Sequence, residues 1–176
     1  MRRELLYTAA HTAGHDARAL HGHLVAAAQS ISVAAERRDV VAALGGFRDP
    51  ALGRRAAELM LTGPFEAREA LLILRTQLDN QATRLGALEW LDANYDTLFA
   101  RGAQDNFDRL PGWADGGCSA EERTRFVAVF AQRVAKLDGG PRSYAEALER
   151  IELCIASRAA QEPSLPAWHK AGAKRR

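Results

Sequence analysis

The sequence predicts an all-α chain, built from antiparallel helical hairpins that stack as a short α-solenoid of the HEAT or armadillo type. Three observations support this fold class. Alanine and leucine dominate the apolar residues, and both enter helices at little cost in free energy. Apolar residues recur at steps of three and four, and no segment shows the period of two that is typical of a strand. Gly, Pro and Asp separate the periodic segments, and short helices with short connections must be antiparallel neighbours.

Six helices are expected in the first hundred residues. Gly14 ends the first helix, and Gly45-Gly46 end the third. Asp49 and Pro50 begin the fourth with a capping carboxylate and a proline at the first helical position. The first five helices are expected at residues 3–13, 16–31, 34–44, 49–61 and 66–78. The sixth has the clearest apolar face, formed by Leu88, Leu91, Tyr95 and Leu98.

The rest of the chain is expected to hold a loop and two more helices. Residues 102–117 contain several glycines and Pro111, so they are predicted to be a loop. Ser119 and Glu122 have the spacing of a capping box. The helix that follows has one apolar stripe, made of Phe126, Phe130, Val134 and Leu137. Residues 139–141, Gly-Gly-Pro, break it, and a last helix follows with Tyr144, Leu148, Ile151 and Ile155 on its apolar face. Of all these residues, Leu91, Leu98, Phe130, Ile151 and Ile155 are expected to be buried between helices.

Four of the five histidines lie close together near the N-terminus. His11 and His15 are four residues apart, a spacing that can place two zinc ligands on one helix face, and His21 and His23 follow. However, Gly14 interrupts that helix, and the sequence has no His-Glu-x-x-His motif. We therefore expect surface or capping histidines, and a small metal-dependent hydrolase is kept as an alternative.

The two cysteines, Cys118 and Cys154, are too few for a disulfide framework. Both are expected to be reduced structural thiols, which is the usual state of an isolated cysteine. Cys118 precedes the predicted cap at Ser119, where a helix dipole lowers thiol pKa values. The sequence shows no nucleophile elbow, phosphate loop or dinucleotide fingerprint. It therefore predicts no catalytic residue, no metal ligand and no cofactor in this chain.

The charge and hydropathy patterns exclude two classes of partner. A net charge of +2 is too small to indicate nucleic acid or an anionic membrane as the main partner. No apolar run approaches the roughly 18 residues that a membrane span needs. The first residues lack the apolar segment of a signal peptide, so a cytoplasmic location is expected.

Residues 83–95, Thr-Arg-Leu-Gly-Ala-Leu-Glu-Trp-Leu-Asp-Ala-Asn-Tyr, resemble a signature of zinc aminopeptidases. The signature, Gly-Arg-x-x-Ala-Trp-x-Phe-x-x-x-Asn-Trp, belongs to the C-terminal helical domain of aminopeptidase N and of the puromycin-sensitive and endoplasmic-reticulum enzymes. Three further stretches agree with the family in order and spacing, at residues 43–50, 112–122 and 139–151. Leu88 and Tyr95 replace two tryptophans of the signature, and both replacements are apolar.

The resemblance implies three parts in the chain. Residues 1–34 match the family poorly and are expected to be the first helices of the same domain. Residues 35–162 are expected to be the aminopeptidase-type domain, and residues 163–176 a basic, flexible tail. The resemblance also implies an architectural role for Arg84 and Asn94, which match the Arg and Asn of the signature. Contact between Arg84 and a peptide carboxylate is the alternative.

In the family, this domain is a non-catalytic stack of helical hairpins that caps the catalytic domain and restricts peptide access. The resemblance therefore implies a fragment or relic whose zinc site lies in a catalytic domain that this sequence lacks. The expected partner is that catalytic domain or a second copy of the chain, and a peptide is a further candidate. Apolar residues of the first helices are expected to form a partly exposed docking face: Leu5, Leu6, Leu20, Leu24 and Val25. The competing interpretation is an autonomous helical-repeat scaffold that binds a protein or peptide.

Overall fold

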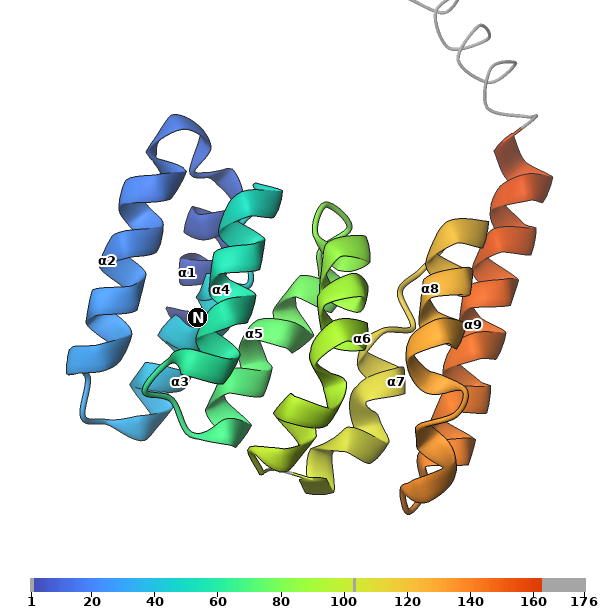
Figure 1. Cartoon of the computed structure of the whole chain (residues 1–176). Coiled ribbons are helices and arrows are strands. Elements are labelled where there is room, and N and C mark those ends of the chain that lie inside the picture. Colours follow the sequence, from blue (N-terminus) through green and yellow to red (C-terminus); the bar gives the residue numbers. More distant parts are fainter. Residues whose placement is uncertain (1, 103, 163–176) are drawn as a thin grey trace, which may run out of the picture.

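Figure 1 shows a computed structural model of the chain, which describes residues 2–102 and 104–162. Within these residues the secondary structure is helical, and no strand is present. The α-helices are α1 (Arg2–Thr12), α2 (Ala17–Ser30), α3 (Ala34–Leu44), α4 (Pro50–Thr62), α5 (Ala67–Asp79), α6 (Arg84–Ala100), α7 (Leu110–Trp113), α8 (Ala120–Phe130) and α9 (Gly140–Gln161). Short 3-10 helices occupy Gly14–Asp16, Gln104–Arg109 and Val134–Lys136. The expected tail, residues 163–176, lies outside the described residues.

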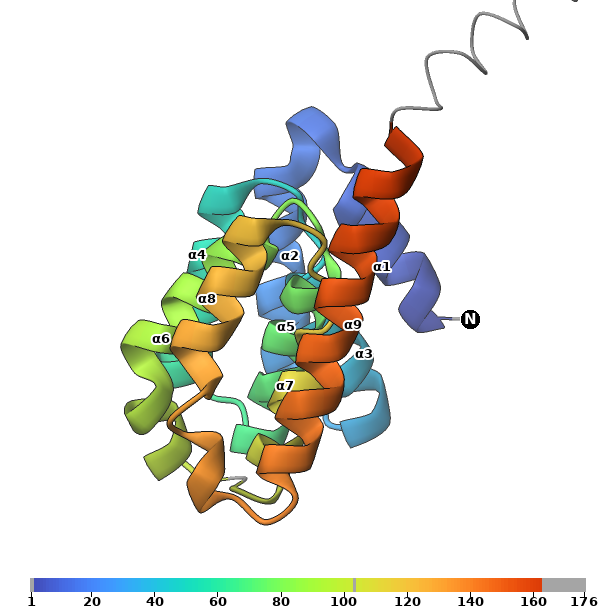
Figure 2. The ribbon, with the colours of Figure 1, turned by 90° about the vertical axis from the view of Figure 1, so that its right-hand side faces the viewer.

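The helices are stacked in two layers, from α1 and α2 at one end to α8 and α9 at the other (Figure 1). In Figure 2, α4, α6 and α8 lie along one side, and α1, α3, α7 and α9 lie along the other. Within a layer α1 packs on α3, α3 on α5, α4 on α6 and α6 on α8, while α2–α3, α4–α5, α5–α6 and α8–α9 pack between layers. This is the predicted stack of antiparallel helical hairpins.

Two predicted helix starts have the capping bonds that the sequence indicates. The Asp49 carboxylate accepts hydrogen bonds from the amides of Ala51 (2.8 Å) and Leu52 (3.4 Å) at the start of α4. The Ser119 hydroxyl accepts a hydrogen bond from the Glu122 amide (3.2 Å) at the start of α8. These bonds satisfy amides that have no partner within the helix. Both helices therefore begin where the sequence predicts.

The predicted loop at residues 102–117 is wrong, because the segment contains a 3-10 helix and α7. Phe107 and Leu110 are fully buried, and the Phe107 ring packs edge-on against Tyr95 and Phe99 of α6. Burial of these two side chains fixes a segment whose glycines and proline are typical of a loop. Tertiary packing here overrides local propensity.

The predicted apolar stripe of the next helix is also interrupted. α8 ends at Phe130, and Val134 belongs to a separate 3-10 helix. Gly139 then has a left-handed φ of 71° and caps α9, which begins at Gly140. A Cβ on Gly140 would lie 2.6 Å from the Val134 carbonyl oxygen, so only glycine fits this close approach.

The apolar core runs through the whole stack and includes four of the residues expected to be buried. Leu91, Leu98, Phe130 and Ile151 are almost fully buried, whereas Ile155 is half-buried against the core. The largest exposed apolar side chains among the described residues are Leu5, Val33 and Leu153. None of the described helices combines the length and apolar character needed to cross a membrane.

Candidate functional site

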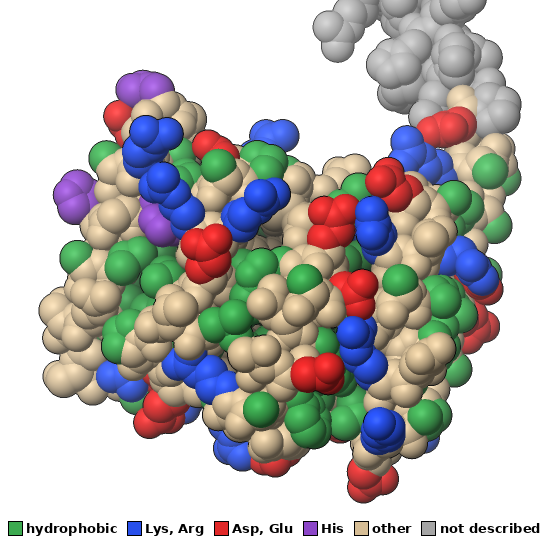
Figure 3. Space-filling view, viewed as in Figure 1, with side chains coloured by type: hydrophobic (Ala, Val, Ile, Leu, Met, Phe, Trp, Pro, Cys, Tyr) green, Lys and Arg blue, Asp and Glu red, His purple; other side chains and the backbone are tan. Residues whose placement is uncertain are grey.

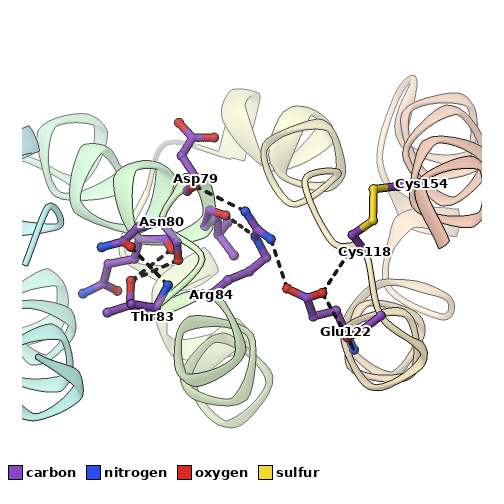
Figure 4. Close-up of polar contacts among 11 residues, drawn as sticks. Asp79, Asn80, Thr83, Arg84, Cys118, Glu122 and Cys154 are labelled. Atoms are coloured by element: carbon purple, nitrogen blue, oxygen red, sulfur yellow. Dashed lines mark hydrogen bonds and ion pairs between the residues drawn. A yellow bond between two sulfur atoms is a disulfide. The ribbon is translucent and has the colours of Figure 1, made fainter. Parts of the chain in front are cut away.

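A polar cluster centred on Arg84 joins the middle of the stack to α8. Arg84 is the first residue of α6 and is only 7% exposed. Its Nε donates to the Leu78 carbonyl oxygen (2.7 Å) and its Nη2 to that of Asp79 (3.3 Å), at the C-terminal end of α5. Its Nη1 donates to Glu122 Oε1 of α8 (3.0 Å), as Figure 4 shows. The cation therefore satisfies helix-end carbonyls and a carboxylate together. We call Arg84, Glu122, Ser119 and Cys118 the Arg84 cluster.

Glu122 is the acidic partner in this cluster. Its Oε2 accepts hydrogen bonds from the Cys118 amide (2.8 Å) and the Ser119 hydroxyl (2.9 Å). Burial by itself raises the pKa of Glu122, but these bonds, the bond from Arg84 and the charge of Arg84 outweigh it. The pKa of Glu122 therefore lies below its ordinary value, and the carboxylate is ionised at neutral pH.

The turn before Arg84 is fixed by two buried polar side chains that the sequence did not single out. Asn80 Nδ2 donates to the carbonyl oxygens of Gly46 (3.3 Å) and Phe47 (3.0 Å), which precede α4. The Thr83 hydroxyl donates to the Gln77 carbonyl oxygen (3.2 Å). The only sequence signal for Asn80 is its position beside a helix end, where an amide often replaces missing backbone bonds.

Two adjacent glycines allow the turn before α8 to approach the cluster closely. A Cβ on Gly116 would lie 3.0 Å from the Arg84 guanidinium. A Cβ on Gly117 would lie 3.1 Å from the Cβ of Glu122 and 3.6 Å from Ile151 of α9. A larger side chain at either position would therefore need Arg84 or Glu122 to shift by a few tenths of an ångström.

Arg84 and Asn94 both lie on α6, but they make separate contacts. Asn94 is half-buried, and its Nδ2 donates to the Trp90 carbonyl oxygen one turn earlier (2.8 Å). The three guanidinium nitrogens of Arg84 each donate to α5 or to Glu122. A peptide contact by Arg84 stays a prediction.

The clustered histidines have different surroundings. His11 Nδ1 lies 3.3 Å from the Gly46 carbonyl oxygen, and His15 is exposed beside Asp16. His21 is 8% exposed and packs against the Phe47 ring, so the expectation of a surface histidine was wrong there. Burial and the nearby charge of Arg55 lower the pKa of His21. Figure 3 shows the histidines gathered at the α2 end of the stack. Between residues 2 and 162, leaving out residue 103, no group of three His, Cys, Asp or Glu side chains is suited to hold a metal ion.

The two cysteines form a disulfide, so the prediction of two reduced and buried thiols was wrong. Their Cα atoms are 5.1 Å apart although 36 residues separate them in the sequence. Cys118 is half-buried, and Cys154 is exposed on α9. The two meet because α9 runs back along α8 and brings its C-terminal half to the turn that precedes α8 (Figure 4). Sequence spacing alone does not reveal such a pairing.

The expected docking face on the first helices is only partly exposed. Leu5 is 64% exposed, while Leu6, Leu20 and Val25 are half-buried. Leu24 is buried in the core, so its predicted exposure was wrong. Leu24 belongs to the apolar core, and α2 packs mainly against α3.

A shallow hollow lies between α4 and α6. Its walls include small residues, and Arg54 and Trp90 contribute larger groups. A Cβ on Gly86 would meet nothing within 4 Å, so part of this hollow is open. The lining residues are Pro50, Gly53, Arg54, Ala57, Gln77, Ala82, Thr83, Gly86, Ala87 and Trp90.

Comparison with known proteins identifies the family. A search of curated proteins gave no match. The family model described as the ERAP1-like C-terminal domain matches residues 2–153, and the match includes the first two helices as well as the Arg84 cluster. This domain is the non-catalytic C-terminal part of aminopeptidases. The chain, with its stacked helical hairpins, therefore belongs to the ERAP1-like C-terminal domain family.

Proposed function

We propose that this chain acts as the non-catalytic C-terminal domain of a zinc aminopeptidase, where it caps the catalytic domain and restricts the access of peptides. The observation that carries the proposal is the family match over residues 2–153. A stack of helical hairpins suits this role, since such stacks present an extended binding surface to a partner. Hydrolysis and zinc binding belong to the catalytic domain, and no residue of this chain is proposed as a zinc ligand.

The end of the stack formed by α1 and α2 is the proposed contact with the catalytic domain. Leu5 of α1 and Val33, just after α2, are both largely exposed, and Leu6, Leu20 and Val25 of the same two helices are half-buried. Exposed apolar side chains that gather on one surface mark interaction sites more often than isolated ones do. Pairing of two copies through this end is the competing outcome. The hollow between α4 and α6 is the proposed place for contact with a peptide.

The catalytic part of the proposal predicts an inactive chain. If the zinc site lies in the catalytic domain, as proposed, this chain by itself has no metal to lower the pKa of water or polarise a peptide carbonyl. The purified chain should not hydrolyse aminoacyl anilides and should not hold zinc in stoichiometric amount. Chelator-sensitive hydrolysis that disappears in His11→Ala or His15→Ala would instead support the small metal-dependent hydrolase.

The docking part is tested by binding in trans. The chain is titrated into a zinc aminopeptidase fragment that lacks its own C-terminal domain, and cleavage of long and short peptides is compared. Leu5→Asp should weaken binding at least tenfold, about 1.4 kcal/mol. Leu153→Asp is the matched control, because Leu153 is 62% exposed at the opposite end of the stack and Leu5 is 64% exposed.

Two results would redirect the proposal. Concentration-dependent sedimentation that Leu5→Asp abolishes would show that the α1–α2 end pairs two copies. A monomer at all concentrations that leaves peptide cleavage by the fragment unchanged would support the autonomous scaffold instead.

A cytoplasmic location is part of the proposal, as the sequence predicts. Disulfides in that compartment are rare, and those that form are usually transient and redox-sensing. In a cytoplasmic protein, the Cys118–Cys154 disulfide would therefore be an exception to the usual reduced state of cysteines. A measurement of the redox state of this disulfide in cells therefore also tests the predicted cytoplasmic location.

A further inference from the structure

The last turns of α9 have few noncovalent contacts with the rest of the domain. From Glu152 to Gln161, every side chain is exposed except Ile155, which is half-buried. The ion pair from Glu152 to Arg123 of α8 lies at the surface, where such pairs contribute little. The pair between Arg158 and Glu162 joins the last turn of α9 to the residue that follows it and does not tie α9 to another helix. Among the described residues, the Cys118–Cys154 disulfide is therefore the covalent link between this part of α9 and the rest of the stack.

The other half of the disulfide belongs to the Arg84 cluster. The Cys118 amide donates to Glu122 Oε2 (2.8 Å), and the opposite oxygen of that carboxylate accepts from Arg84 (3.0 Å). Figure 4 shows Cys118 between Glu122 and Cys154. A change at the disulfide therefore acts on the exposed end of α9 and, through one backbone amide, on the buried ion pair.

We propose that the Cys118–Cys154 disulfide is a redox-sensitive link that a dithiol reductant opens in the folded protein. In the oxidised state, the link holds the C-terminal half of α9 against the turn that precedes α8. In the reduced state, this half of α9 separates from the turn, and the turn at residues 114–118 loosens around the Arg84 cluster. The rest of the stack stays folded. This inference goes beyond the proposed capping role and does not depend on it.

The reaction is an ordinary thiol–disulfide exchange. A thiolate of the reductant attacks the exposed Cys154 sulfur, the bond between the two cysteine sulfurs breaks, and Cys118 leaves as a thiolate. The second thiol of the reductant, as its thiolate, then attacks the mixed disulfide and releases Cys154. The two protein thiolates take up the two protons that the dithiol gives up. Two electrons pass to the protein, and the dithiol becomes a disulfide.

The exposure pattern supports reduction without unfolding. Cys154 is exposed, so a reductant reaches its sulfur while the core stays packed. Cys118 lies directly before the first turn of α8, where the positive end of the helix dipole stabilises a leaving thiolate. The fully buried side chains of α5 and α6 lie in helices that the link does not join, so this part of the core should stay packed when the link opens.

The test follows hydrogen exchange by mass spectrometry in the whole chain, before and after treatment with dithiothreitol under native conditions. Alkylation should count no thiol before treatment and two after it. Amide exchange at residues 152–161 should rise by about tenfold or more, as expected when a helix end opens locally. Exchange at residues 114–119 should rise less, and exchange in α5 should not change. Reoxidation should restore the first pattern. Cys154→Ser, without reductant, should reproduce the reduced pattern and should not respond to dithiothreitol.

Each other outcome contradicts the inference. A disulfide that resists dithiothreitol until the protein is denatured would be structural and not redox-sensitive. Two thiols with unchanged exchange at residues 152–161 would show that noncovalent packing holds α9. Increased exchange throughout α5 would mean that the disulfide supports the whole domain. Because the wild-type chain itself is treated with dithiothreitol, these outcomes are distinguishable even if Cys154→Ser fails to fold.

Discussion

α5 and α9 show two different ways of holding a helix in the same stack. α5 has 13 residues, of which eight are buried, and it packs against α3, α4, α6 and α7. α9 has 22 residues, of which three are buried, and it packs against α7, α8 and the 3-10 helices Gln104–Arg109 and Val134–Lys136. A helix in the middle of the stack is therefore held by burial on several sides. The last helix has one packed face and relies on individual links for the rest.

The polar side chains of α5 and α9 differ in the same way. Glu69 of α5 is 2% exposed and receives two hydrogen bonds from Arg37 of α3, each of 3.0 Å. Gln77 of α5 donates to the Gly53 carbonyl oxygen at 2.6 Å. The ion pairs of α9 with other elements, Arg123–Glu152 and Arg150–Asp115, involve solvent-exposed arginines. Buried pairs are costly to break, and exposed pairs contribute little.

The largest expected effect on the free energy of unfolding concerns two ion pairs made by adjacent residues of α8. One pair is buried and the other is exposed. Glu122 pairs with the buried Arg84, and Arg123 pairs with Glu152 of α9. Arg84→Met should lower the free energy of unfolding by about 3–5 kcal/mol, because it leaves Glu122 buried without its cation. Arg123→Met should cost less than about 1 kcal/mol, as at other exposed pairs. Urea unfolding measures both.

A double variant shows where the cost of Arg84→Met arises. If the unpaired charge causes it, Arg84→Met combined with Glu122→Leu should recover most of the lost stability. If the double variant is as unstable as Arg84→Met alone, the bonds from Arg84 to the α5 carbonyls matter more than the ion pair.

The next largest effect is expected when a buried isoleucine is truncated in α5 or in α9. Ile73 of α5 and Ile151 of α9 are both fully buried. Truncation of either to alanine should cost about 2–5 kcal/mol, because each leaves a cavity. Ile73→Ala should lie near the upper end, since helices surround it on more sides and collapse less readily. Thermal unfolding provides the comparison, and Arg54→Glu on the exposed face of α4 should cost less than about 0.5 kcal/mol. Equal losses in all three variants would mean that the buried faces are misassigned.

The sequence predicts the helices better than it predicts their links. α1 to α6 begin and end within a few residues of the expected positions, because helix period and capping residues are local signals. α7 was missed, because burial of Leu110 overrides the glycines and proline around it. The disulfide and the Arg84–Glu122 pair were missed for another reason. Both join residues more than thirty positions apart, and their distance depends on how the hairpins stack. The motif pointed to Arg84 but did not identify its partner.

The smallest expected effect is a dependence of stability on pH in two separate windows. The pKa of His21 lies below its ordinary value of 6.5, because burial and Arg55 disfavour its charged form. The unfolded chain therefore binds a proton at this residue as pH falls through 6.5, while the folded chain does not. Stability should be complete above this pH and should fall below it. In His21→Leu, this decrease should disappear.

Glu122 produces the second pH-dependent loss of stability, at lower pH than that of His21. Its pKa in the folded chain lies below the ordinary value of 4.5, since hydrogen bonds and Arg84 more than offset its burial. The stabilisation from its ionised form is complete above pH 4.5 and is lost as pH falls through the lowered pKa. Urea midpoints at neutral, weakly acidic and strongly acidic pH separate the two groups. Wild type should lose stability in both pH ranges, that of His21 and that of Glu122. His21→Leu should lose stability only in the lower range. In Arg84→Met, the loss in the lower range should be smaller. A loss in the lower range that is unchanged in Arg84→Met would assign it to other carboxylates and would remove Glu122 as a pH-dependent link between the centre of the stack and α8.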